Sequence, residues 1–320
     1  MPPVETLVLI VNYRTPELSI ACLQSLAPEI APGINAIIVD NDSGDGSAEK
    51  IAAAVEANGW GSWCRFRALP RNGGFAYGNN EALARWKAET GRPTPKYVWL
   101  LNPDTLVRPG AIGALTRFMD AHPTAGITGG RSEEMDGTAI YSAFRFHRPF
   151  NELLEALDFG PLHRLFASKI VAPAPVDHPI RADWVAGASM MVRGDLIDRI
   201  GFLDESYFMY FEETDFCLRA ARAGAECWYV PESRIVHLVG ASSGVTGATA
   251  KVKRRPRYWF ESRRRYFAKN FGSGAFHAAN AAWLFGRPVG RLLARLRGKP
   301  VTDPPHLWGD MIRHNYGSGA

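Results

Sequence analysis

Short runs of aliphatic residues alternate with helical patterns over the first two-thirds of this 320-residue chain. Their Val, Ile and Leu content is typical of strands that are buried on both faces. Strands that alternate with helices predict an α/β fold, in which helices cover a mostly parallel central sheet. The expected strands are Thr6–Asn12, Ala36–Asp40, Arg65–Leu69, Tyr97–Leu101, Gly126–Gly129, Val185–Val192 and Glu226–Val230.

Helical patterns fill the intervals between these strands. Ser47 is expected to be an N-cap, and Pro109 suits a first helical turn. An aromatic and Pro-rich connection, roughly residues 140–183, follows the fifth strand. The expected helices are Pro16–Leu26, Ser47–Ala57, Gly78–Lys87 and Pro109–Ala121, with a short one around Asn151–Leu157.

The C-terminal part of the chain is strongly basic. Residues 251–299 contain fourteen Lys and Arg and one acid, so this stretch has a net charge of +13. Because the net charge of the whole chain is +5, the remaining residues sum to −8. Arg287, Arg291 and Arg295 lie four residues apart, on one face of a helix that Pro288 should kink or begin. This stretch could be a solvated face, a nucleic-acid site or a surface that contacts anionic lipids. We expect the lipid surface, and no nucleic-acid partner, because no nucleic-acid-binding module accompanies the stretch.

The cysteine residues and the hydropathy of the chain indicate the cellular compartment in which the protein is expected. Cys22, Cys64, Cys217 and Cys227 are scattered, so they predict small buried side chains in a reducing compartment rather than a zinc site or disulfide framework. The N-terminal residues show no secretory signal, and nowhere do 18 apolar residues run together. We expect a cytoplasmic protein that can bind peripherally at the inner face of the cell membrane.

Polar residues follow three of the expected strands, in the motifs Asn12-Tyr13, Asp40-Asn41-Asp42 and Asn102-Pro103-Asp104. Ligands of open α/β sheets bind beyond the carboxyl ends of strands, although Asp and Asn also favour ordinary turns there. The segment RNGGFAYGNN (71–80) adds glycines that let backbone N–H groups approach an anion. Three such motifs and this loop predict a ligand site at one sheet edge.

A second group of ionisable residues lies further along the chain. Glu212, Glu213 and Asp215 stand before an amphipathic helix, where they can interact with its dipole and where Asp215 can pair with Arg219. Aromatic neighbours also favour a carboxyl group with a raised pKa, which is suited to a general base. His237 follows a β-rich run and can be either a hydrogen-bonded core residue or a ligand.

In order and spacing, these motifs resemble family 2 glycosyltransferases with the GT-A fold, especially their rhamnosyltransferase-like branch. The resemblance covers roughly residues 5–272. Each block is weakly specific alone, and the series is highly specific. The blocks are LVLIVNYRT (7–15), IIVDNDSGDGS (37–47), RNGGFAYGNNEAL (71–83), WLLNPDTLVRPGAI (99–112), DWVAGASMMVR (183–193), IGFLDESYFMYFEETDFCLRA (200–220), YVPESRIVHLVGASS (229–243) and RYWFESRRRYFAKNFG (257–272).

The resemblance implies a catalytic domain over residues 1–250, with a nucleotide-binding half (about 1–125) and an acceptor half (about 126–250), and a basic helical extension over 251–320. It implies a divalent ion, Mg²⁺ or Mn²⁺, on Asp104 and His237. Glu213 matches the family's catalytic base, although Glu replaces Asp there and leaves Asp215 as an alternative. The remaining implied residues are Asn12, Tyr13, Asp40, Asn72, Gly73, Gly74, Phe75 and Asn102 for the nucleotide, and Trp184, Gly187 and Glu212 for the acceptor and donor sugar.

The implied reaction is an inverting transfer of a sugar, with rhamnose from dTDP-rhamnose as the leading donor, to a glycan or lipid-linked acceptor in cell-surface polysaccharide synthesis. A nucleotidyltransferase that makes sugar nucleotides is an alternative, but it needs a glycine-rich basic loop after the first strand, where this chain has VNYRTPEL. A catalytically inactive membrane-associated scaffold is another alternative. The presence of Asp104, Glu213 and His237 favours an enzyme.

Overall fold

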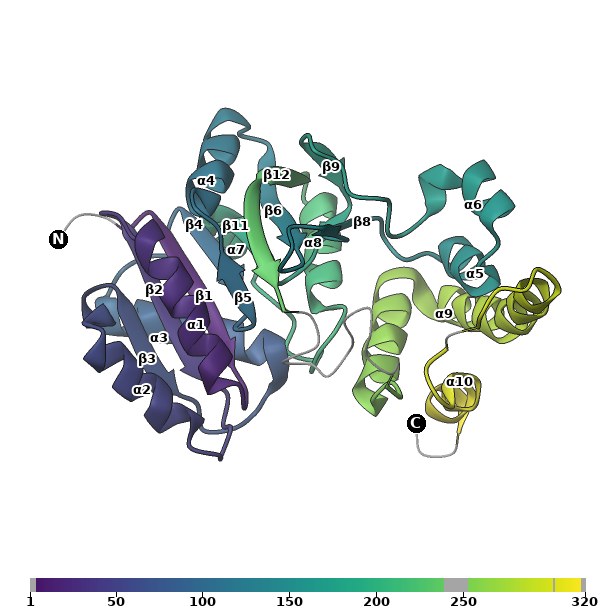
Figure 1. Cartoon of the computed structure of the whole chain (residues 1–320), viewed down its shortest axis with the longest axis horizontal. Helices are drawn as coiled ribbons and strands as arrows, with labels where there is room; N and C mark the ends of the chain where they lie inside the picture. The colour runs from purple at the N-terminus through teal and green to yellow at the C-terminus, as the bar shows by residue number, and fades with distance from the viewer. Residues whose placement is uncertain (1–3, 239–252, 302, 318–320) are drawn as a thin grey trace.

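The computed structural model describes residues 4–238, 253–301 and 303–317. Its main sheet has the order β3-β2-β1-β4-β11-β6-β12-β5, with β7 beside β6 and β9 beside β12 (Figure 1). The first four of these strands are parallel to one another. The strands are β1 (Thr6–Asn12), β2 (Ile34–Asp40), β3 (Cys64–Ala68), β4 (Tyr97–Leu101), β5 (Thr105–Val107), β6 (Ala125–Glu133), β7 (Ala139–Ile140), β9 (Ile180–Ala182), β11 (Ser189–Arg193) and β12 (Glu226–His237).

Both faces of this sheet are buried, as the aliphatic strands predict. Along β1, Leu7 and Leu9 belong to one hydrophobic cluster, while Val8 and Ile10 belong to the other. This period of two is the pattern of a strand that is covered on both sides. The helices are α1 (Pro16–Leu26), α2 (Ser47–Ala57), α3 (Gly74–Thr90), α4 (Ala111–Ala121), α5 (Pro149–Leu157), α6 (Gly160–Leu165), α7 (Gly194–Ile200), α8 (Glu212–Arg222), α9 (Arg257–Leu296) and α10 (Leu307–Tyr316).

The two halves that the sequence implies share one sheet. β4 of the first half pairs antiparallel with β11 of the second, and β11 pairs in turn with β6. The expected boundary at residue 250, and the Gly/Ser/Thr-rich stretch before it, lie outside the described residues. The four cysteines are free and buried, as expected.

The roles predicted for Ser47 and Pro109 at two helix starts are wrong. Ser47 is the first residue of α2 and not its N-cap, since Gly46 holds that position and the Asp45 carboxylate accepts a hydrogen bond from the Ser47 amide at 3.1 Å. Pro109 precedes α4, whose N-cap is Gly110. The carboxylate of Glu29, from another part of the chain, accepts a bond from the Gly110 amide at 2.7 Å.

The expected strand Val185–Val192 is divided in the structure. Residues 186–188 form a turn between β10 (Trp184–Val185) and β11, and β10 pairs with β8 (Ala143–Phe144) in a separate small sheet. The Pro288 prediction is also wrong. The break in α9 lies at Gly272, where φ is 83° and ψ is 170°, and the helix continues through Pro288.

Candidate functional site

A cavity of about 480 Å³ lies beyond the carboxyl end of β4. β2 and β3 lie on one side of β1 in the sheet and β4 lies on the other, so the strand order reverses direction at this point. Such a switch in strand order is where open α/β sheets bind ligands. The cavity is large enough for a small organic ligand. Its lining consists of Val11, Tyr13, Asn41, Asn72, Gly74, Phe75, Asn102, Pro103, Asp104, Ala186, Gly187, Ala188, Phe208, Met209, Tyr210, Glu212, Glu213, His237 and Tyr258.

Strand pairing brings Asp104 and His237 together across more than a hundred residues of sequence. β5 begins directly after Asp104 and runs antiparallel to β12, with Thr105 opposite His237. The Nε2 atom of His237 lies 3.4 Å from Oδ1 of Asp104. Asp104 is 1% exposed. A carboxylate and an imidazole at this separation form a donor pair suited to a divalent ion.

A strained turn presents Glu212 and Glu213 at the opposite wall. Tyr210 and Phe211, directly before α8, have φ of 71° and 68°, a left-handed conformation that costs bulky side chains energy. The turn directs both glutamates to the cavity that Asp104 and His237 line. Strain of this kind recurs where the surrounding structure must hold a functional group in place.

The environment of these two glutamates favours their neutral forms. Burial raises the pKa of the Glu213 carboxyl. Burial, and then the charge of Glu213, raise the pKa of Glu212 well above its ordinary value. One carboxyl oxygen of each residue, Oε2, is buried without a hydrogen-bond partner among the described residues. Such a pair can hold a proton and also accept one from a ligand.

The predicted nucleotide residues divide into two groups. Asn12 and Asp40 are buried behind the cavity and are bound to each other, from Nδ2 of Asn12 to Oδ1 of Asp40 at 2.6 Å. Asp40 also accepts bonds from the amide and hydroxyl of Ser43, and Asn12 accepts one from the hydroxyl of Ser19 in α1. Tyr13 and Asn102, in contrast, line the cavity.

The glycine-containing loop is built to bring backbone close to the cavity. Gly74 has φ of 87°, and a Cβ at this position would meet the carbonyl oxygen of Phe208 at 1.9 Å, so only glycine fits there. The side chain of Asn72 accepts a hydrogen bond from the Gly74 amide at 3.0 Å. Gly74 and Phe75 line the cavity together with Asn72, whereas Gly73 packs on Tyr77 outside its lining.

Two further predicted residues, Asp215 and Trp184, lie outside the lining, as Asn12, Asp40 and Gly73 do. Asp215 is fully buried and binds Lys269 at 2.7 Å, Asn270 at 2.8 Å, and Tyr207 and Arg219 at 3.1 Å, so its oxygens are occupied. Trp184 stacks on Phe144, with ring centroids 4.2 Å apart, and supports the site from behind. Gly187 and Glu212 line the cavity as predicted.

The prediction also missed several lining residues. Asn41 follows β2 and donates to the Gly74 carbonyl at 3.0 Å, while its Oδ1 has no partner among the described residues. Phe208, Met209 and Tyr210 also line the cavity; their segment was interpreted from the sequence only as an aromatic environment for the acids, and not as part of the lining. Tyr258 comes from the first turn of α9 and stacks on Tyr210 with ring centroids 6.0 Å apart. The only sequence feature that could have predicted a role for Asn41 was its place in the motif Asp40-Asn41-Asp42 at a strand end.

In the part of the chain that the structure describes, no helix combines the length and apolar character needed to cross a bilayer.

Comparison with known proteins identifies the family. The model of glycosyl transferase family 2 matches residues 7–171, just over half of the chain, and that of glycosyl transferase family group 2 matches residues 97–293. The chain is 28% identical over 231 residues to the N-acetylglucosaminyl-diphospho-decaprenol L-rhamnosyltransferase of Mycobacterium tuberculosis, covering 69% of this chain and 72% of that protein. It is 26% identical over 171 residues to rhamnosyltransferase WbbL of Escherichia coli, covering 51% and 60%.

Among solved structures, the mannosyltransferase PcManGT of Pyrobaculum calidifontis, in complex with GDP-Man and Mn²⁺, is similar in fold, with a TM-score of 0.56 at 17% identity. The match covers 94% of this chain and 77% of that chain. The chain therefore belongs to glycosyltransferase family 2 and has the GT-A fold.

Proposed function

We propose that this enzyme transfers a sugar from a nucleoside diphosphate to a hydroxyl group of a glycan or lipid-linked acceptor in cell-surface polysaccharide synthesis. One observation carries the proposal: Asp104, His237 and Glu213, far apart in the sequence, line one cavity. The proposed donor is dTDP-rhamnose, and the names of the M. tuberculosis and E. coli relatives support rhamnose as the transferred sugar. The M. tuberculosis name, with its diphospho-decaprenol, supports a lipid-linked acceptor.

Asp104 and His237 would hold the divalent ion, either Mg²⁺ or Mn²⁺. A carboxylate oxygen and an imidazole nitrogen 3.4 Å apart fit this group, because one or two protein ligands with substrate phosphates are a usual set for Mg²⁺. When bound, the ion supplies positive charge against the diphosphate leaving group.

Glu213 is the proposed base. Its carboxylate accepts the proton of the acceptor hydroxyl as that oxygen forms a bond to the anomeric carbon. The bond from the anomeric carbon to the diphosphate oxygen breaks in the same step, so the configuration inverts. Asp215 is the weaker choice, because Lys269, Asn270, Tyr207 and Arg219 already occupy its oxygens. Glu213 is partly buried and lines the cavity, so an acceptor hydroxyl bound there can reach its carboxylate.

Other lining residues supply the remaining contacts. We propose that Tyr13 stacks on the nucleobase and that Asn41 accepts a hydrogen bond from it through Oδ1. The loop from Asn72 to Phe75 lies against the nucleotide, while Asn12 and Asp40 shape the turns behind it. The aromatic wall of Tyr210 and Tyr258 faces the sugars.

Thermal unfolding with a panel of nucleotide sugars tests this proposal. A ligand that binds only the native state raises the melting temperature, and at a hundredfold excess over Kd the gain is about 2.7 kcal/mol. We expect selective stabilisation by dTDP-rhamnose with Mg²⁺ or Mn²⁺, and loss of the metal-dependent part in Asp104→Asn. The matched control is Asp177→Asn, which changes a carboxylate that is 89% exposed.

Equal stabilisation of the Asp104→Asn variant would remove Asp104 from the metal site. If a nucleoside triphosphate and a sugar phosphate yielded pyrophosphate, the enzyme would be a nucleotidyltransferase instead. Donor binding without transfer to any acceptor, and without donor hydrolysis in the presence of metal, would indicate an inactive scaffold.

A further inference from the structure

The second half of α9 carries an exposed apolar stripe. Phe285 is 74% exposed, Val289 48%, Leu292 58% and Leu296 75%. Spacings of four, three and four residues place these side chains on one face of the helix. Large side chains this exposed, and this regular in their spacing, mark an interaction surface.

Packing on the other side of α9 fixes the direction of this stripe. Gly286 and Gly290 are buried against α5, and a Cβ at Gly290 would meet the carbonyl oxygen of Leu157 at 2.4 Å. This close approach of the two helices leaves the stripe pointing outward. α5, α9 and α10 form the end of the molecule opposite β3 (Figure 1).

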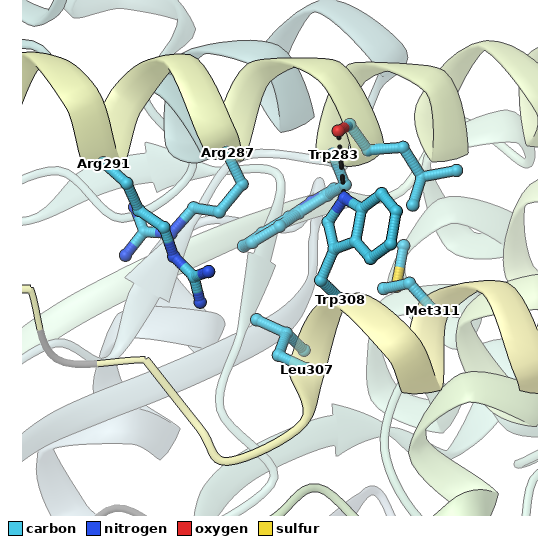
Figure 2. A pocket seen from close by; sticks show the side chains of 7 residues that line it. Trp283, Arg287, Arg291, Leu307, Trp308 and Met311 are labelled. Atoms are coloured by element: carbon cyan, nitrogen blue, oxygen red, sulfur yellow. Dashed lines mark hydrogen bonds between the residues drawn. The ribbon is translucent and has the colours of Figure 1, made fainter.

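α10 supports the same helix along its flank. Pro288 has no N–H to donate to the carbonyl of Leu284, and Nε1 of Trp308 donates to that carbonyl at 3.1 Å (Figure 2). Trp308, Ile312 and Tyr316 are 47%, 38% and 46% exposed and recur every four residues. α10 therefore adds a second apolar stripe beside the first.

The charged side chains that the second half of α9 itself carries are all positive. Residues 271–301 contain no Asp or Glu. Arg287 and Arg291 are neutralised by Asp303, which both side chains contact. Arg295, Arg297 and Lys299 are exposed, and none has a carboxylate within 4.0 Å among the residues that the structure describes. The end of α9 is thus a cationic border for the apolar stripe.

Several cations in the earlier part of the basic stretch form ion pairs within the molecule. Arg263 is 1% exposed and pairs with Glu152 at 2.6 Å. Lys269 binds Asp204 and Asp215, and Arg254 binds Asp310. Within the expected lipid contact over residues 251–299, the large exposed apolar side chains all lie in the last fifteen residues, so we place the contact there.

We propose that Phe285, Val289, Leu292 and Leu296 insert into the interface of an anionic lipid bilayer, while Arg295, Arg297 and Lys299 contact lipid phosphates. An amphipathic helix with one apolar face and a cationic border lies in the membrane plane at the boundary of headgroups and acyl chains. A second copy of the chain fits this face less well. In a twofold contact the cations of each copy would meet the same helix of the partner, and residues 271–301 offer no Asp or Glu to pair with them.

Sedimentation with vesicles tests the surface without donor or acceptor. The wild-type protein should bind phosphatidylcholine vesicles that contain phosphatidylglycerol, and bind pure phosphatidylcholine weakly. Phe285→Ser with Leu292→Ser should weaken binding tenfold or more, and Arg295→Gln with Lys299→Gln by roughly fivefold for each charge. The matched control is Met135→Ser with Tyr141→Ser, at side chains 64% and 56% exposed in another part of the surface.

Wild-type binding by either variant would overturn the proposal, as would equal binding to neutral and anionic vesicles. A dimer that the Phe285→Ser, Leu292→Ser pair dissolves, with no vesicle binding, would assign the stripe to a second copy. Asp104→Asn should still bind vesicles, and the two surface variants should still bind donor. Failure of the lipid surface and failure of the proposed reaction are therefore distinguishable.

Discussion

At the start of α8, the adjacent carboxyl groups of Glu212 and Glu213 both have raised pKa values. Only a deprotonated Glu213 can act as base, and burial raises its pKa. We therefore predict that turnover rises with pH through this elevated pKa and levels off above it. Glu213→Gln should lower kcat by about 10²–10⁴-fold, remove this acidic limb and leave nucleotide binding intact. Initial rates across pH provide the measurement.

The control for that variant is Glu49→Gln, which changes an exposed carboxylate in the first turn of α2. Its rate profile should match that of the wild type. If Glu213→Gln kept the wild-type rate and pH profile, the base would have to be another residue.

Glu212 gives a prediction for stability. Its folded-state pKa lies well above its ordinary value, so the folded state binds more protons than the unfolded state between these two pKa values. Stability therefore falls as pH rises through this interval. Glu212→Gln removes the ionisable group and should raise the melting temperature at neutral pH by a few degrees. Thermal unfolding at several pH values checks this, and an unchanged pH dependence would contradict it.

The position of a polar residue at a strand end does not by itself predict whether its side chain lines the cavity. That depends on which hydrogen bonds the side chain makes in the folded protein. Polar residues after β1 and β2 were expected from the sequence, but Asn12 and Asp40 bind each other and the neighbouring turns. Asn41, one position later, lines the cavity instead. Similarly, Asp215 follows Glu213 by two residues but points toward Lys269 and away from the site.

At the scale of elements, long periodic segments were predictable and short ones were not. β1, β4, α1 and α2 have the expected bounds, because their apolar residues follow the strand or helix period over five or more positions. β5 has only three residues, and its existence depends on pairing with the distant β12. That pairing also extends β12 past the expected Val230 to His237.

The break in α9 gives a prediction at this scale. Gly272 has φ of 83° and ψ of 170°, a region open almost only to glycine. Gly272→Ala should therefore destabilise the fold by about 1–3 kcal/mol. Gly274→Ala, two residues later in the helix and with open space around it, is the matched control and should stabilise by about 0.5–1 kcal/mol. Urea denaturation compares them, and equal effects would remove the backbone explanation.

For the whole molecule, the basic C-terminal segment packs into the same hydrophobic core as the central sheet. Tyr266, Phe267 and Phe276 belong to the same hydrophobic cluster as β1 and α3, and Tyr258 lines the cavity. We propose that residues 251–320 are an extension of the catalytic domain that folds together with residues 1–250. The composition of this segment predicted its positive charge. It did not predict that Tyr266, Phe267 and Phe276 are buried, because their packing partners are distant in the sequence.

Truncation tests whether residues 1–250 need the C-terminal segment in order to fold. A chain that ends after residue 250 lacks the whole of α9, which packs against α5, and so lacks Arg263 and Trp283, two of the three side chains that bind the buried Glu152 carboxylate. Because the aromatic cluster is lost as well, we predict no cooperative thermal transition for this chain. A chain that ends at Lys299 loses α10, which buries only a few residues including Leu307 and Met311, and it should still unfold cooperatively at a lower temperature. A cooperative transition in the shorter chain would show that residues 1–250 fold alone, with the C-terminal helices attached to a finished domain.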